Sequence, residues 1–416
     1  MKKLDSWKKQ FAIIYVGQAF SLLGSAAVQF AVIWWLTIQT ESAMVLTLST
    51  IVAFVPNMFI GPFAGVLVDR YNRKLVMMAA DGLVALSSVI LGLVFLINQA
   101  PPIWFIFVIL FVRGIGNMFH SPAMQAAIPM LVPAEHLTKA GGYGNLINSL
   151  SNMLGPVLGA ALMGVAPIAT IMLIDIVGAL FAIVCLLFVN ISDIPRSVEM
   201  PHLSQDLKQG LGAMRENKPL MAVFFPMVMM NVIYMPLGTL FPLLVRTHFL
   251  GEAIHNSIVE FIFAGGLLIS SLMIGVWGGM KNRFLMASLA VVLLGVTSLV
   301  SGILPATTLG FVIFAVVCFF MGMSGTFINV PVMAYVQEST APEMMGKVFS
   351  LMMTAMTWSM PIGLLIAGPV CEVIGVGTWF FWSGVALVLT GILCRVLTRP
   401  YDQQTRLPEK KKKIVS

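Results

Sequence analysis

The sequence predicts an all-α membrane protein with twelve transmembrane helices in two six-helix pseudo-repeats. The first observation is composition: 59% of the 416 residues are hydrophobic and only 10% are charged, whereas a soluble domain carries about 25% charged residues. The second is a series of apolar runs of about 20 residues, the length that crosses a bilayer. These runs begin near residues 11, 44, 75, 103, 140, 167, 219, 257, 284, 309, 347 and 378.

The third observation is an internal repeat. Five positions recur in the second half at offsets of 205 to 210 residues, which are Gly65 and Gly275, Arg73 and Arg283, Pro122 and Pro331, Pro133 and Pro342, and Pro156 and Pro361. Parallel repeats of this kind are typical of secondary transporters. We expect an N-terminal six-helix bundle (1–189), a cytoplasmic linker with an amphipathic helix (190–218), a C-terminal six-helix bundle (219–397) and a basic tail (398–416).

The distribution of charge predicts the orientation in the membrane. With the N-terminus inside, 22 of the 24 Lys and Arg residues fall in cytoplasmic segments, as the positive-inside rule requires. Both termini are therefore expected in the cytoplasm. The net charge of +7 follows from this topology, so we expect no nucleic-acid partner. The N-terminus leads into the first span without a cleavage site, so no signal peptide is expected.

The sequence gives no indication of enzyme chemistry. The four cysteines are widely separated and form neither a CxxC pair nor a metal cluster. No phosphate-binding loop or soluble domain could hold ATP. We therefore expect no cofactor and no metal, and an ion gradient as the energy source.

Polar residues inside the first half are the first candidates for the transport pathway. The first span carries Gln18, Ser21 and Ser25 at near-helical spacing, and the third holds Asp81 two turns beyond Lys74. We expect Asp81 either to form a structural ion pair with the basic turn that contains Lys74 or to take part in transport.

The fourth and sixth spans add three titratable residues. Arg113 lies near the middle of the fourth span, where a cation costs on the order of 3 kcal/mol and faces a cavity or a partner. We expect it to face the central cavity. His120 is expected either to be hydrogen-bonded in the packing or to carry protons. Asp175 lies in the middle of the sixth span.

In the second half, Glu260 is expected about one turn inside the outer surface. Prolines are expected to interrupt the seventh helix at Pro226, Pro236 and Pro242. The full set of candidates for the substrate and proton pathway is Gln18, Asp81, Arg113, Asp175, Asn231, Glu260 and Asn329.

The turn between the second and third spans reads GVLVDRYNRKLVM (65–77). It resembles the signature loop of the major facilitator superfamily, here a cytoplasmic gate formed by Gly65, Asp69, Arg70, Arg73 and Lys74. Asn72 stands where that family has Gly, and Asn tolerates a left-handed backbone.

The resemblance implies the major facilitator fold, in which the sixth helix is usually peripheral, so Asp175 is expected to pair within the N-terminal bundle. It also implies that Asp69 lies near the start of the eleventh helix, around Gly346 and Lys347. A carboxylate at a helix N-terminus gains about 0.3–2 kcal/mol, so Asp69 is expected to latch the cytoplasmic side. Gly279, its counterpart in the second repeat, has no charge to lose and is expected to tolerate Ala.

The fifth span resembles the antiporter motif of drug:proton exchangers through Gly142, Gly155, Pro156 and Gly159. Ordinary packing of small residues between helices explains the same pattern equally well. Both interpretations remain open from the sequence.

The chain also resembles the macrolide efflux group, through SPAMQAAIPMLVPAEHLTKAGGY (121–143), GKVFSL (346–351) and MPIGL (360–364). This resemblance implies an exporter of amphipathic, cationic drugs, acting by proton antiport with alternating access in a bacterial inner membrane. Glu260 would then be the counter-charge for the cargo. We also expect a monomer. Alternatives are export of another amphiphile such as a siderophore, or a transporter-like lipid-handling or sensor protein.

Overall fold

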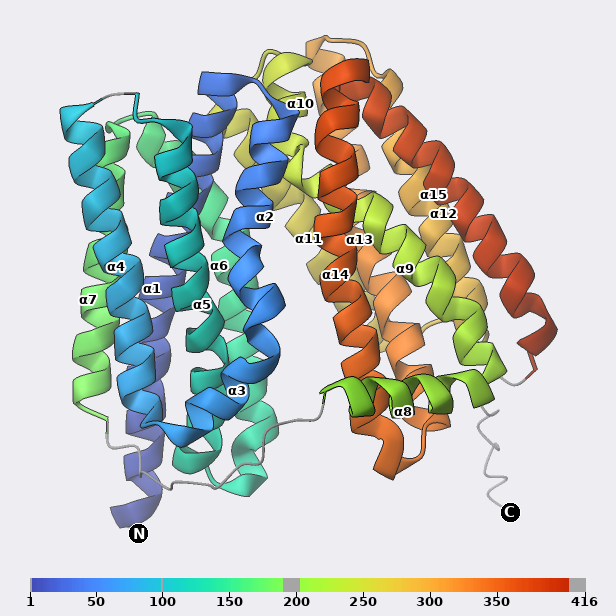
Figure 1. The fold of residues 1–416 in the computed structure, drawn as a ribbon, viewed down its shortest axis with the longest axis horizontal. Helices are drawn as coiled ribbons and strands as arrows, with labels where there is room; N and C mark the ends of the chain where they lie inside the picture. Colours follow the sequence, from blue (N-terminus) through green and yellow to red (C-terminus); the bar gives the residue numbers. More distant parts are fainter. Residues whose placement is uncertain (1, 99, 190–202, 404–416) are drawn as a thin grey trace. The chain divides into compact units, whose positions relative to one another are not determined.

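The computed structural model describes residues 2–98, 100–189 and 203–403, and they form helices joined by short turns (Figure 1). The helices are α1 (Lys2–Thr40), α2 (Ala43–Phe59), α3 (Gly61–Arg70), α4 (Arg73–Ile97), α5 (Ile103–Leu131), η1 (Ala134–His136), α6 (Leu137–Met163), α7 (Ile168–Leu187), α8 (Leu203–Glu216), α9 (Lys218–Thr239), α10 (Phe241–Thr247), α11 (Ala253–Trp277), α12 (Arg283–Ile303), α13 (Thr308–Ser339), α14 (Pro342–Ile374), α15 (Val376–Thr398) and η2 (Arg399–Tyr401).

Eleven of these described helices are long and apolar enough to cross a membrane. The shorter α2 supplies the twelfth span together with α3, which continues it after a break at Ile60. From the second span onward, each predicted start lies within five residues of the observed one. The predicted all-α membrane fold is therefore confirmed.

Contacts divide the chain into two compact units. Unit 1 comprises Met1–Pro201 and Thr239–Phe261, and unit 2 comprises His202–Gly238 and Ile262–Ser416. The division into two six-helix bundles separated by residues 190–218 stays a prediction, and residues 190–202 lie outside the described part of the chain.

The expected interruptions of the seventh span are wrong at two of three prolines. Helix α9 passes through Pro226 and Pro236 and ends at Thr239, so the break falls just before Pro242 in α10. Proline is tolerated within a membrane helix where neighbouring groups satisfy the freed carbonyls. Helix α11 begins at Ala253, so Glu260 lies two turns into it, where one turn was expected.

The turn between α3 and α4 shows why Asn replaces Gly. Asn72 has φ −63°, and its side chain accepts hydrogen bonds from the backbone N–H groups of Lys74 and Leu75. Asn72 is therefore a helix cap, and its backbone is not left-handed. Asn282 caps α12 in the second repeat in the same way.

The other residues of this turn have separate roles. Lys74 Nζ donates to the carbonyl oxygens of Leu187 and Val189 at the end of α7. Arg73 is buried and Arg70 is exposed. The surroundings of Gly65 and the side chain of Asp69 are outside the described set, so the Asp69 latch stays a prediction.

The backbone conformation of Gly279 does not support the expectation that Ala is tolerated at this position. Gly279 has φ +80°, a conformation that costs an L-residue about 1–2 kcal/mol. The expectation considered only the missing charge and overlooked this turn geometry.

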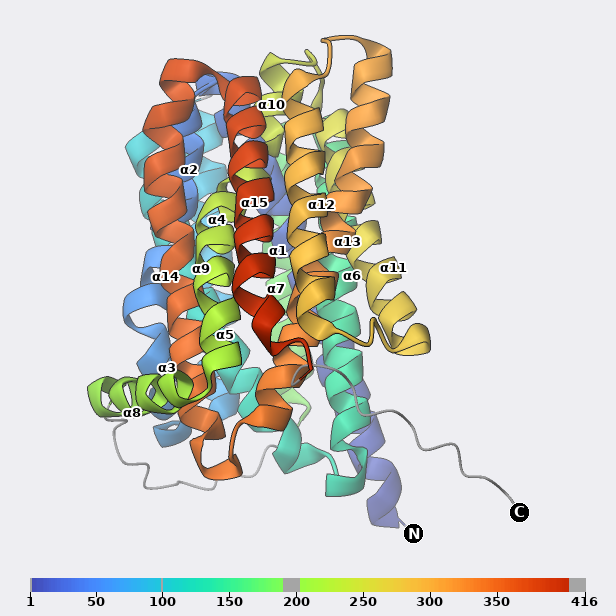
Figure 2. The same ribbon diagram turned by 90° about the vertical axis from the view of Figure 1, so that its right-hand side faces the viewer.

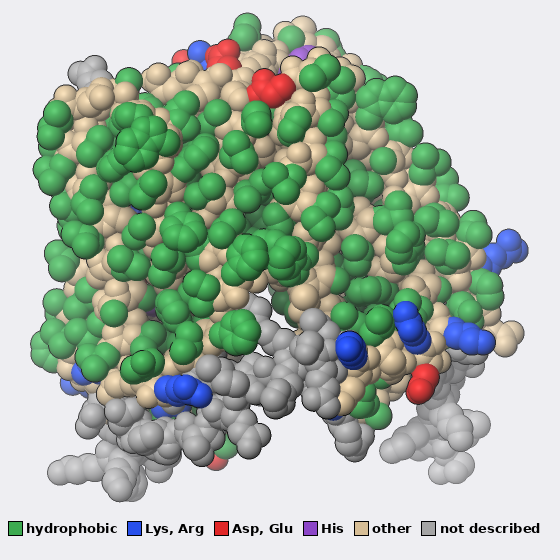
Figure 3. Space-filling view, viewed as in Figure 1, with side chains coloured by type: hydrophobic (Ala, Val, Ile, Leu, Met, Phe, Trp, Pro, Cys, Tyr) green, Lys and Arg blue, Asp and Glu red, His purple; other side chains and the backbone are tan. Residues whose placement is uncertain are grey.

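Within unit 2, α8 runs across the ends of α9 and α14 (Figures 1 and 2). Gly210 of α8 packs against the backbone of Lys347, and Lys347 Nζ donates to Gln209 Oε1. Hydrophobic side chains cover the middle of the visible face of unit 2, while Lys and Arg gather at the end that carries α8 (Figure 3).

Within unit 1, α1 packs between α6 and α7, and α4 packs against α5 and α7. A Cβ added at Gly155 would lie 2.4 Å from Ala26 Cβ, and one at Gly159 would lie 2.6 Å from the Ala27 carbonyl oxygen. These two glycines therefore let α6 approach α1 closely. Gly142 has open space around it.

Candidate functional site

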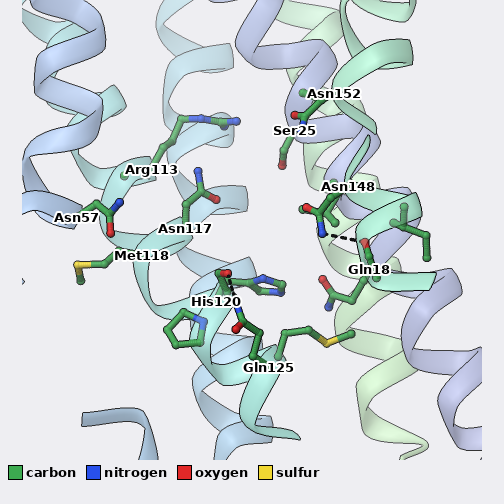
Figure 4. Close-up of a pocket in the computed structure, with 18 of the residues that line it drawn as sticks. Gln18, Ser25, Asn57, Arg113, Asn117, Met118, His120, Gln125, Asn148 and Asn152 are labelled. Carbon is green, nitrogen blue, oxygen red and sulfur yellow. Dashed lines mark hydrogen bonds between the residues drawn. The ribbon is translucent and has the colours of Figure 1, made fainter. Parts of the chain in front are cut away.

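A cavity of about 970 Å³ opens in unit 1 between α1, α2, α5 and α6 (Figure 4). This volume is at the upper end for sites that bind drug-sized molecules. Among the described residues that line it there is no Asp or Glu. Its most frequent polar groups are carboxamides, contributed by Gln18, Gln29, Asn57, Asn117, Gln125, Asn145, Asn148 and Asn152.

The helical period explains how these side chains reach one face. On α5, Asn117, Ser121 and Gln125 recur every fourth residue after Arg113, and residues at this spacing share a helix face. On α6, Asn145, Asn148 and Asn152 are three and four residues apart, so they also share one face of their helix. Of these eight carboxamides, only Gln18 is among the residues predicted from the sequence. The four-residue spacing on α5 indicates a shared face for Asn117 and Gln125 and could have identified them.

The first buried charge cluster joins α5 to α7. Arg113 Nη1 lies 2.5 Å from Asp175 Oδ2 and 2.6 Å from Ser88 Oγ. Ser88 donates to the same carboxylate oxygen at 2.6 Å, and Ser25 donates to Oδ1 at 2.5 Å. Arg113 is 3% exposed and Asp175 is 0% exposed. A buried ion pair whose oxygens are all hydrogen-bonded is well compensated.

Two predicted pathway residues meet in this cluster. Arg113 is among the residues that line the cavity, and Asp175 pairs with it inside the N-terminal half. The arginine therefore combines a place in the cavity wall with a fixed partner.

The second cluster contains the other buried acid of α4. His120 Nε2 lies 3.6 Å from Asp81 Oδ1, and Gln18 Nε2 and Ser21 Oγ each lie 3.4 Å from its carboxylate oxygens. The expected ion pair with the basic turn is wrong. Two turns of helix separate Asp81 from Lys74 by roughly 10 Å, and Lys74 turns toward α7 instead.

A smaller cavity of about 240 Å³, also in unit 1, shares Ala26, Gln29 and Asn152 with the large one. Glu260 lines it, and Asn256 Nδ2 donates to Glu260 Oε1 at 2.8 Å. The other lining residues are Phe30, Ile33, Trp34, Pro156 and Asn256. Trp34 and Trp35, near the end of α1, are buried (2% and 9% exposed).

Four predicted pathway residues line neither cavity: Asp81 and Asp175, which belong to the two buried clusters, and Asn231 and Asn329. Asn231 donates to Met356 Sδ at 2.9 Å inside unit 2, and Asn329 is exposed and donates to the carbonyl of Gly325 on its own helix. In the described part of the chain, no three His, Cys, Asp or Glu side chains come together as a metal site.

Comparison with known families decides the assignment. The model of the Major Facilitator Superfamily matches residues 14–363. This chain belongs to the major facilitator superfamily. It is a multi-pass membrane transporter, and the predicted family is confirmed.

Relatives within the superfamily are close. The chain is 37% identical to macrolide efflux protein A of Streptococcus pyogenes over 399 residues, which cover 95% of this chain and 98% of that protein. A macrolide efflux protein A of Enterococcus faecalis is 38% identical over 325 residues, which cover 78% and 99%. The predicted resemblance to this group is confirmed.

Solved structures show the same fold at low identity. A bacterial homologue of the human lysosomal transporter Spinster matches with a TM-score of 0.71 and 11% identity, covering 97% of this chain and 99% of that one. At this identity the match shows the facilitator fold alone.

Proposed function

We propose that this transporter is a secondary active exporter of amphipathic drugs, with macrolide-type antibiotics as cargo, acting by proton antiport with alternating access. The observation that carries the proposal is the carboxamide-lined cavity of about 970 Å³ in unit 1. The names of its relatives in Streptococcus and Enterococcus support the choice of cargo.

The lining fits a large ligand that is rich in oxygen and largely uncharged. Each carboxamide offers two donors and an acceptor, so it can bind a hydroxyl, ester or ether group in either direction. Between the amides lie apolar side chains that can pack against a hydrocarbon skeleton, including Leu22, Phe54, Leu110, Met118 and Met124. Methionines adapt to irregular shapes, which suits a range of cargoes.

The smaller cavity supplies the charge that the larger one lacks. Because the two share Ala26, Gln29 and Asn152, a single cargo can fill both. Its ammonium group would then lie beside Glu260, next to Phe30 and Trp34. A carboxylate with apolar walls favours an organic cation.

The energy source and the topology complete the proposal. Buried titratable side chains in unit 1 provide sites for a transported proton, and the chain has no nucleotide-binding motif. We further propose a monomer in a bacterial inner membrane, with both termini in the cytoplasm and two six-helix bundles as its domains.

Expression in a pump-deficient bacterium tests this function. We expect higher minimal inhibitory concentrations for macrolides, reversed by a protonophore. Replacing two lining amides (Asn148→Leu with Asn152→Leu) should abolish this resistance, because the cargo loses its hydrogen bonds there. Asn98→Leu, an exposed amide outside both cavities, is the matched control and should keep resistance.

Three results would contradict the proposal. Resistance that survives the protonophore would show that the proton gradient does not drive efflux. Resistance to other amphiphiles but not to macrolides would show that the cargo is a different class of compound. An absence of efflux for every compound favours a lipid-handling or sensor protein.

A further inference from the structure

The cluster around Asp81 differs from every other buried polar group of unit 1 described above, because none of its contacts is close. Its three partners lie at 3.4 to 3.6 Å, whereas ordinary hydrogen bonds between such groups span about 2.5–3.2 Å. Asp81 is only 6% exposed. Buried carboxylates normally satisfy their oxygens more fully.

Two orphaned atoms adjoin the same acid. His120 Nε2 and Gln18 Oε1 are buried, and neither has a hydrogen-bond partner among the described residues. Both side chains line the large cavity, while Asp81 lies behind them. An unpartnered buried donor or acceptor costs about 1–3 kcal/mol, so this arrangement favours a state that gains a proton and new bonds.

The surroundings leave His120 as the titratable partner of Asp81. The helices packed against α4 bring Arg113 and His120 (α5) and Asp175 (α7). Helix α1, which reaches Asp81 through Gln18 and Ser21, carries Tyr15. Arg113 and Asp175 are bonded to each other, and Tyr15 donates to the carbonyl of Ala140. On α4 itself, Lys74 is directed to the end of α7.

We propose that Asp81 and His120 together form the proton-binding site of this transporter, reached from the cargo cavity past His120 and Gln18. The site rests on the proposed proton antiport and names where the proton binds. A proton from cavity water binds the pair and raises its charge by one. Its release to water on the other side of the membrane restores the original state.

Gln18 couples this site to the cargo. In the structure its Nε2 donates to Asp81, which fits an ionised carboxylate. A protonated carboxyl instead donates from its O–H, and Gln18 Oε1, which has no hydrogen-bond partner among the described residues, can accept that bond. The amide must then turn, which changes the group that Gln18 presents to the cavity. Proton and cargo therefore compete, and the coupling is reciprocal.

The test uses the purified full-length chain in detergent. Binding of the macrolide erythromycin is measured by calorimetry from about pH 6 to about pH 8, the range in which His titrates, and proton release is measured with a pH indicator. Because protonation opposes cargo, wild-type affinity should rise with pH, by up to about tenfold per unit for one linked proton.

Asp81→Asn and, independently, His120→Asn should bind erythromycin with a flattened pH dependence and release little or no proton. They should also lose efflux driven by a proton gradient. Glu135→Gln, which removes an exposed carboxylate from η1, is the control and should behave as wild type. Size-exclusion profiles verify folding, and His120→Asn keeps the test decisive if Asp81→Asn misfolds.

The outcomes separate the two proposals. Wild type that releases protons, with variants that release as many, overturns the Asp81–His120 site and leaves proton antiport intact. Wild type that releases none and pumps in the presence of a protonophore overturns both.

Discussion

Two buried acids in the same helix bundle have opposite surroundings. Asp175 accepts bonds of 2.5–2.6 Å from Arg113, Ser88 and Ser25, whereas no partner of Asp81 comes closer than 3.4 Å. Side chains of α1 and α5 contact both acids. The difference is that Asp175 has a permanent cation, since a guanidinium does not deprotonate in proteins, while Asp81 has a histidine that can gain or lose charge.

The two pairs suit different roles: the tight pair suits stability and the loose pair suits proton binding. A fully bonded ion pair resists a change of charge, because protonating Asp175 would leave Arg113 buried without a counter-ion. The loosely bonded pair has no such constraint. Neighbouring positions on the same helices can therefore hold the bundle together and respond to protons independently.

The largest effect is expected from breaking the tight pair. Arg113→Ala should lower efflux by about tenfold or more and stability by about 3–5 kcal/mol, because Asp175 is left as an uncompensated buried charge. The protein should still insert in the membrane. Arg113→Ala combined with Asp175→Ala should recover part of that stability. Thermal unfolding and efflux of the three variants measure this, and a double variant less stable than both single ones would contradict it.

A third acid extends the comparison to cargo. Glu260 has one described hydrogen bond, from Asn256, and lines the small cavity. Glu260→Gln should weaken efflux of cationic drugs several-fold more than efflux of neutral ones, because it removes charge and keeps shape. Glu252→Gln, at an exposed position just before α11, is the matched control. Equal loss for both drug classes would point to folding or proton coupling instead.

The smallest and sharpest test removes one hydroxyl from each cluster. Ser25→Ala should cost about 1.5–3 kcal/mol, as expected for a short bond to a charged group, and Ser21→Ala about 0.5 kcal/mol. Denaturation of the two variants in parallel measures the difference. Equal costs would mean that the lengths of the two contacts do not report their strength.

The helices were predictable because the bilayer sets their length, and each predicted start after the first lies close to an observed one. The pairing of Asp175 within its own half was also predictable, because the sixth helix is usually peripheral in the family that the sequence resembles. Its partner Arg113 was recognised separately as a mid-membrane cation.

Other parts of the site depend on which way side chains point around a helix. Asp81 was assigned to the basic turn because Lys74 is close in sequence, but that lysine caps α7 and His120 of another helix takes its place. The carboxamide lining needs α1, α2, α5 and α6 together, and no single helix shows it. The role of Asn72 as a helix cap depends on local backbone angles.

The close fit of α6 on α1 has an evolutionary consequence. Gly155 and Gly159 have no room for a larger side chain, so selection for new cargoes cannot act there without moving the helix that carries Gln18, Ser21 and Ser25. The amides on α5 and α6 are free of that constraint and can be exchanged one at a time. Among the lining amides, Gln18 also donates to Asp81, so a broader drug range should evolve around it while that glutamine stays unchanged.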